Sequence, residues 1–78
     1  MASNIQAVIF KRELYDTTSA KRWLKRHHHD PIKRVHTSVN YLRYRLRVPD
    51  ENKYEYRIKD LGNGINFVIG FLPYQMIE

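Results

Sequence analysis

Residues 41–48 read YLRYRLRV, and the strict alternation of apolar and basic side chains in this stretch predicts a β-strand. One face of the strand would carry Leu42, Tyr44, Leu46 and Val48, and the other Tyr41, Arg43, Arg45 and Arg47. Residues 54–58, YEYRI, alternate again after PDEN at 49–52, which has turn chemistry. We therefore predict a hairpin of these two segments, in which Glu55 could lie opposite one of the arginines.

Two further strands are predicted outside this hairpin. Residues 4–10, NIQAVIF, form a short apolar run rich in β-branched side chains. Residues 65–72, INFVIGFL, are apolar on both faces, which is typical of a central strand, and Pro73 would close it. The preceding Gly62-Asn63-Gly64 permits positive φ angles. Residues 32–36 either add a short strand or lead into the hairpin as a loop.

A helix is predicted at about residues 19–28, where neither Gly nor Pro occurs. Its N-cap hydroxyl would come from Thr17, Thr18 or Ser19, and it ends before Pro31. One face would carry Ala20, Trp23, Leu24 and His27, with Trp23 as the anchor into the core. The predicted fold class is α+β, with one helix packed on a mostly antiparallel sheet of four or five strands, in the order β-α-(β)-β-β-β.

The length of 78 residues allows one domain, which we place at residues 4–73 between terminal segments 1–3 and 74–78. The chain has no Cys, so disulfides and thiolate metal sites are excluded, and association with a second copy is the remaining way to reinforce a small core. No apolar run approaches the roughly 18 residues that span a bilayer, and no signal peptide is visible. We expect a soluble, intracellular protein with no membrane partner.

Positive charge is concentrated in one part of the chain. The formal net charge is +6, and residues 20–48 hold nine basic residues against one acid, Asp30. This distribution predicts a polyanion as the partner, and nucleic acid in particular. Three arginines on one strand face, roughly 7 Å apart, suit phosphate contacts, and Tyr41 and Tyr56 could stack on bases. The predicted contact residues are Arg43, Arg45, Arg47, Lys21, Arg22, Lys25, Arg26, Lys33, Arg34 and Tyr41.

Other interpretations of these residues stay open. The Tyr/Arg strand face could instead keep the sheet soluble, or form a homodimer or other protein interface. The helix cations could form an ordinary solvated face. His27-His28-His29 is explained by contact with helix C-terminal carbonyls better than by a metal site, although protonation near pH 6.5 would add charge to the cluster. No catalytic motif is visible, so we expect no enzyme, cofactor or small-molecule substrate.

Four segments in chain order resemble a family of short proteins carried by phages, giant DNA viruses and their virophages: AKRWLKRH at 20–27, NYLRYR at 40–45, GNGI at 62–65 and VIG at 68–70. Within this family, the chain resembles small basic virophage proteins of the Zamilon type. The resemblance implies a viral origin, a role in the cytoplasm (viral factory) of the host cell or in the virion, and DNA rather than RNA as the partner; it supplies no catalytic residues. His28-His29 departs from the family pattern, which often has Gly and an aromatic residue or Lys there, so a conventional Gly helix stop is missing.

Overall fold

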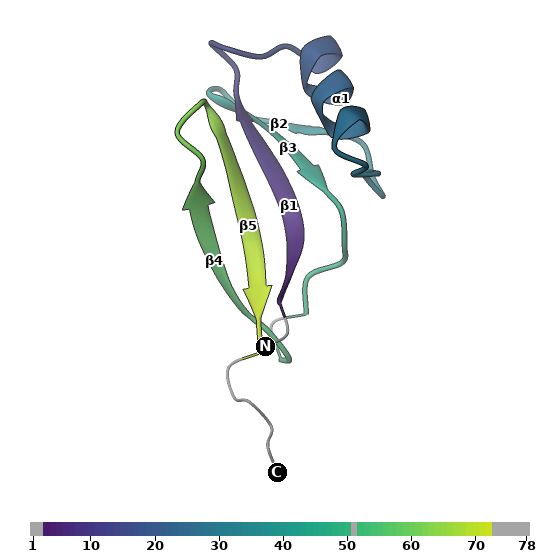
Figure 1. Cartoon of the computed structure of the whole chain (residues 1–78), viewed down its shortest axis with the longest axis vertical. Coiled ribbons are helices and arrows are strands. Elements are labelled where there is room, and N and C mark those ends of the chain that lie inside the picture. Colours follow the sequence, from purple (N-terminus) through teal and green to yellow (C-terminus); the bar gives the residue numbers. More distant parts are fainter. Residues whose placement is uncertain (1–2, 51, 73–78) are drawn as a thin grey trace.

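The computed structural model describes residues 3–50 and 52–72. Its elements are β1 (Ser3–Lys11), α1 (Thr17–Arg26), β2 (His36–Thr37), β3 (Tyr41–Arg45), β4 (Glu55–Asp60) and β5 (Ile65–Phe71). The predicted α+β class is confirmed, and β2 supplies the optional fifth strand (Figure 1). Residues 1–2 and 74–78 of the expected termini, the turn residue Glu51 and the strand-closing Pro73 lie outside the described residues.

The sheet is antiparallel with the strand order β2-β3-β1-β5-β4, and this order overturns the predicted hairpin. β3 pairs with β1 and β2, whereas β4 pairs with β5, so two strands separate the supposed hairpin partners. Glu55 lies opposite Phe71 and not opposite an arginine. Alternation shows which side chains share a face but does not identify the neighbouring strand. The largely apolar β1 and β5 take interior positions because they can bury side chains on both faces.

β3 is also shorter than the predicted strand 41–48, and a bulge in β1 explains where it ends. The register of β1 against β5 shifts between Ile5 and Ala7. At this point the backbone carbonyl of Gln6 accepts hydrogen bonds from the N–H groups of both Leu46 (2.8 Å) and Arg47 (3.2 Å). Two successive residues, Leu46 and Arg47, thus lie opposite the single residue Gln6, and such an arrangement interrupts the regular pairing of two strands. Arg47 therefore lies beyond β3 and does not continue its row of arginines.

The core lies between α1 and one face of the sheet. Leu24 of α1 packs with Val8 and Phe10 of β1, and the remainder of this buried cluster comprises Ala20, Leu42, Tyr44 and Ile65. The Phe10 ring makes edge-to-face contacts with Tyr15, Trp23 and Tyr44. Trp23 is half-buried at the edge of this cluster, so the predicted anchor contacts the core from its side.

The helix begins two residues earlier than predicted because Asp16, and not a hydroxyl residue, caps it. The Asp16 carboxylate accepts a hydrogen bond from the Ser19 N–H (2.8 Å), and the Ser19 hydroxyl accepts one from the Asp16 N–H (3.1 Å). These reciprocal bonds form a capping box. They also hold the pKa of Asp16 below its ordinary value, chiefly through the Ser19 N–H.

At the other end, His28 takes the place of the missing glycine. Its φ is 61°, in the left-handed region, and its N–H donates to the Lys25 carbonyl (3.1 Å) while the His29 N–H donates to the Leu24 carbonyl (2.9 Å). This pair of bonds is a Schellman motif, which closes the helix two residues before the predicted end. A ring nitrogen of His27 makes the expected contact with a helix carbonyl, that of Trp23, at 2.9 Å.

No helix within residues 3–50 and 52–72 is long and apolar enough to cross a membrane.

Candidate nucleic-acid interface

A groove of about 850 Å³ opens between α1 and the loop that follows it. Its apolar walls come from Leu24 of α1, Pro31 and Val35 of the loop, and Tyr44 of β3. The Ile32 N–H donates to the Arg45 carbonyl at 2.9 Å, which ties the loop to β3. The helix and the loop that follows it therefore meet β3 in one site.

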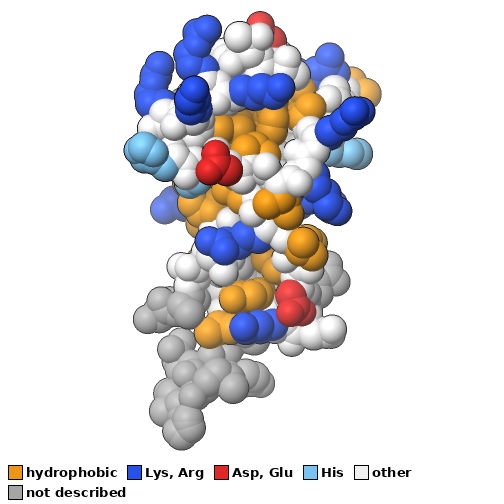
Figure 2. Space-filling model, turned by 90° about the vertical axis from the view of Figure 1, so that its right-hand side faces the viewer, with side chains coloured by type: hydrophobic (Ala, Val, Ile, Leu, Met, Phe, Trp, Pro, Cys, Tyr) orange, Lys and Arg blue, Asp and Glu red, His pale blue; other side chains and the backbone are white. Residues whose placement is uncertain are grey.

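Four cations surround the groove: Lys21 and Lys25 of α1, and Lys33 and Arg34 of the loop. The two lysines are four residues apart, so they lie on the same side of the helix. Figure 2 shows basic side chains around an apolar hollow on this side of the molecule. All four are exposed, and none forms an ion pair with another described residue. A cluster of unneutralised like charges is stabilised when an anion approaches it.

His29 and Asp30 also line the groove. Partial burial lowers the pKa of His29, and the neighbouring His27 and His28 lower it further, whereas Asp30 raises it. At neutral pH His29 is therefore mainly uncharged, and the positive charge of the groove comes from the lysines and Arg34. Protonation of His29 would add to that charge only at a pH below 6.5.

Tyr44 also lines the groove, and it is not among the contact residues predicted from the sequence. Its side chain is 1% exposed, and its hydroxyl oxygen is buried without a hydrogen-bond partner among the described residues. Burial raises the pKa of this hydroxyl, and the charge of Asp16 raises it further. Alternation placed Tyr44 on the apolar face of its strand, where tyrosine is the one side chain with a polar tip. A polar hydroxyl on an otherwise apolar strand face was the sequence feature that could have identified Tyr44.

The remaining predicted contact residues are not at the groove. Side chains alternate along β3, so Arg43 and Arg45 lie on the sheet face opposite α1, whereas Tyr44 lies beneath the helix. Arg22 and Arg26 are exposed on α1 but do not line the groove. Arg47 lines an adjoining hollow of about 450 Å³, which shares His29 and Asp30 with the groove. The sheet thus separates Arg43 and Arg45 from the helix and loop cations.

The Arg43 side chain makes contacts within the protein, so it is only partly available to a ligand. It is half-buried, one of its terminal nitrogens donates to the Gln6 side-chain oxygen at 3.5 Å, and its Nε is buried without a partner among the described residues. Gln6 in turn donates from its side chain to the Arg47 carbonyl at 2.9 Å. Arg43 therefore has a structural role at the bulge, and Arg45 is the more available of the two strand arginines.

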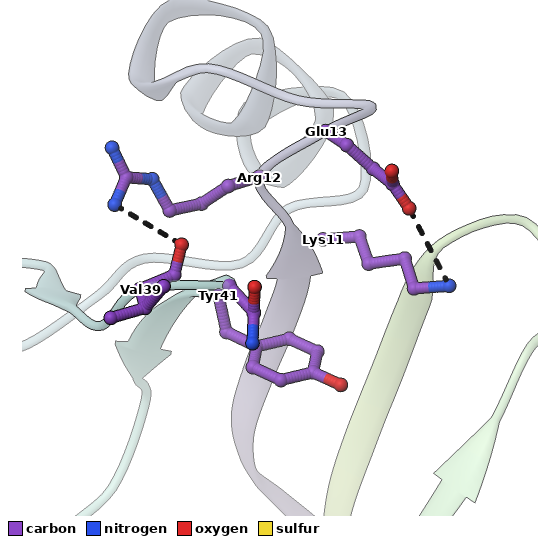
Figure 3. A pocket seen from close by; sticks show the side chains of 6 residues that line it. Lys11, Arg12, Glu13, Val39 and Tyr41 are labelled. Atoms are coloured by element: carbon purple, nitrogen blue, oxygen red, sulfur yellow. Dashed lines mark hydrogen bonds and ion pairs between the residues drawn. The ribbon is translucent and has the colours of Figure 1, made fainter.

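The tyrosines expected beside the arginine row lie apart from each other. Tyr41 is opposite Lys11 of β1, near a second pocket of about 420 Å³, and Tyr56 is on β4 at the far side of the sheet. In this pocket Arg12 donates to the Ser38 and Val39 carbonyls (2.7 and 3.5 Å), and Lys11 is 4.0 Å from Glu13 (Figure 3). Because these cations already have partners, the pocket is a weaker anion site than the groove.

Among residues 3–50 and 52–72, no group of three or more His, Asp or Glu side chains is placed to hold a metal ion. His27 instead stacks on Trp23, with ring centroids 3.9 Å apart. The consecutive histidines thus take up different positions at the helix end.

Three comparisons, with family models, with curated proteins and with solved structures, found no match to this chain.

Proposed function

We propose that this protein binds nucleic acid without catalysing a reaction on it, through the groove between α1 and the following loop. The observation that carries the proposal is the set of four exposed cations around one groove, none of them paired with an acid in the described part of the chain. Such contacts recognise phosphates and not base sequence, so binding would be largely sequence-tolerant. The choice of DNA over RNA, and a viral setting, follow from the family that the sequence resembles.

The test compares two double variants that remove the same charge from the same helix. Lys21→Ala with Lys25→Ala removes two groove cations, whereas Arg22→Ala with Arg26→Ala removes two exposed cations that do not line the groove. Binding of a labelled oligonucleotide is measured by fluorescence anisotropy at several salt concentrations. We expect the groove variant to bind about tenfold more weakly or worse and to lower the salt slope by about 2, and the control to lose much less.

Circular dichroism checks that both variants keep the wild-type fold. Absence of wild-type binding at low salt, or binding that is indifferent to salt, would refute the proposal. Equal losses in the two variants would mean that net charge, and not the groove, determines affinity.

A second candidate function is protein association through the sheet face opposite α1. Among the described elements none covers this face. Ile58 of β4 is 66% exposed there, and the half-buried Arg45 and the exposed Tyr41 lie on β3, with two strands in between. Aromatic residues and arginine are enriched at interfaces, and a second copy of the chain is the simplest partner. Light scattering of wild type and Ile58→Asp tests this: a dimer that dissociates in the variant supports it, and a monomeric wild type excludes self-association.

A further inference from the structure

We propose that the groove receives one unstacked base of a single-stranded nucleic acid, while the cations around it hold the phosphates on either side. This inference rests on the proposed function and adds to it the kind of strand that is bound. It depends on three properties of the groove: its apolar walls, its uncommitted polar groups and the placement of its cations.

The apolar walls match a base and not a phosphate. Pro31 and Val35, the accessible apolar side chains of the groove, would offer a phosphate no hydrogen bond, whereas the face of a base is apolar and can lie against them, above the buried Leu24 and Tyr44. The volume of about 850 Å³ is within the roughly 300–1,000 Å³ usual for small-molecule sites, so a nucleotide fits. A duplex keeps its bases stacked inside and cannot fill an apolar groove in this way.

Two polar groups in the groove suit the edge of a base. The Tyr44 hydroxyl is buried without a partner among the described residues, and leaving such a group unsatisfied is costly. A base edge offers both donors and acceptors that could supply the partner. Asp30 is the acid among the groove residues, and its carboxylate would repel a phosphate but accept a hydrogen bond from a base amino group.

The cations leave the centre of the groove free for the base. Lys21 and Lys25 are one helical turn apart, about 6 Å, on one wall, and Lys33 and Arg34 are on the other. Long lysine and arginine side chains on two walls can reach the phosphates that precede and follow an inserted nucleotide. The four cations would therefore bind the sugar-phosphate backbone of the strand along the rim of the groove, and the apolar walls would contact the inserted base.

The experiment compares two single strands of equal length and charge. One is a mixed-sequence DNA oligonucleotide, and the other has the same sugar-phosphate backbone with stable abasic sites throughout. Both are titrated against wild type, Tyr44→Phe and a matched control, Tyr56→Phe. Tyr56 is on a different part of the sheet, where its hydroxyl oxygen accepts a hydrogen bond from the Asp50 N–H at 2.7 Å.

We expect wild type to bind the base-bearing strand about tenfold more tightly than the abasic strand. This ratio should shrink in Tyr44→Phe and persist in Tyr56→Phe. Equal affinity of wild type for the two strands would overturn the inference while leaving charge-based binding intact. Failure of both strands to bind would instead refute the proposed function. A ratio that Tyr44→Phe leaves unchanged would overturn the assignment of the Tyr44 hydroxyl to the base.

Discussion

The ring of Tyr56 on β4 lies directly against Gly70 of the neighbouring β5. A Cβ on Gly70 would come within 2.8 Å of the Tyr56 Cε1 atom and 3.3 Å of its Cδ1 atom. The ring cannot easily move away, because the Tyr56 hydroxyl oxygen accepts the hydrogen bond from the Asp50 N–H. Gly70 is thus required here by a close approach of side chain to backbone.

Gly70→Ala should therefore destabilise the protein by about 1–3 kcal/mol, the usual cost of overpacking. Urea unfolding followed by circular dichroism measures this. In a Tyr56→Ala background the same change should cost clearly less, because the obstructing ring is gone. An equal cost in both backgrounds would show that the Tyr56 ring is not the obstacle.

His28→Gly should stabilise the protein by about 1 kcal/mol. His28 has a φ of 61° in the Schellman motif, and a side chain in the left-handed region carries a steric cost that glycine avoids. Chemical denaturation gives the change in unfolding free energy. Lys25→Gly, within α1, is the contrasting control and should destabilise by about 1 kcal/mol. Loss of stability in His28→Gly would contradict the assigned role of this residue.

Removal of the tyrosine hydroxyl should change the free energy of unfolding in opposite directions at Tyr44 and at Tyr56. Tyr44→Phe deletes a buried group that lacks a hydrogen-bond partner among the described residues, so the free energy of unfolding should rise by about 1 kcal/mol. Tyr56→Phe deletes the acceptor for the Asp50 N–H and should lower it by up to about 1 kcal/mol. Thermal and urea unfolding of the two variants check the signs. A destabilised Tyr44→Phe would mean that the Tyr44 hydroxyl has a stabilising partner in solution.

Stability should fall in mild acid in part because of His29. Its pKa in the folded protein is lowered from 6.5, mainly by burial, so the unfolded chain takes up the proton more readily. The contribution of the uncharged His29 to the free energy of unfolding is intact above pH 6.5. It is lost as the pH falls through the lowered pKa of His29 in the folded protein. His29→Gln should therefore remove part of the acid-induced loss, measured as unfolding free energy against pH.

His36→Gln is the control for this experiment because His36 is exposed on β2, away from α1. A pH profile of His29→Gln that matches that of wild type would contradict the prediction. Because His29 lines the groove, we also expect oligonucleotide binding by wild type to tighten below pH 6.5, and His29→Gln to lose part of this gain.

Several features followed from the sequence because they depend on local chemistry. The alternation at residues 41–45 places Leu42 and Tyr44 on the buried face, and the apolar run 65–71 indicates an interior strand. The helix was recognised from its periodicity, although its two ends were set by Asp16 and His28, whose capping roles depend on backbone angles. Lys21, Lys25, Lys33 and Arg34 were among the predicted contact residues, and they lie around one groove.

Strand order and the division of the cations between two faces were decided by tertiary structure alone. Pairing of β3 with β1, and of β4 with β5, depends on which apolar faces can be buried together over long sequence separations, and alternation within one segment carries no such information. The bulge at Gln6 ended β3 before Arg47. The sequence by itself therefore determined the fold class and the excess of positive charge. Only the packing of α1 on the sheet gathered part of that charge around Tyr44, because burial of Leu24 fixes which side of the helix faces outward.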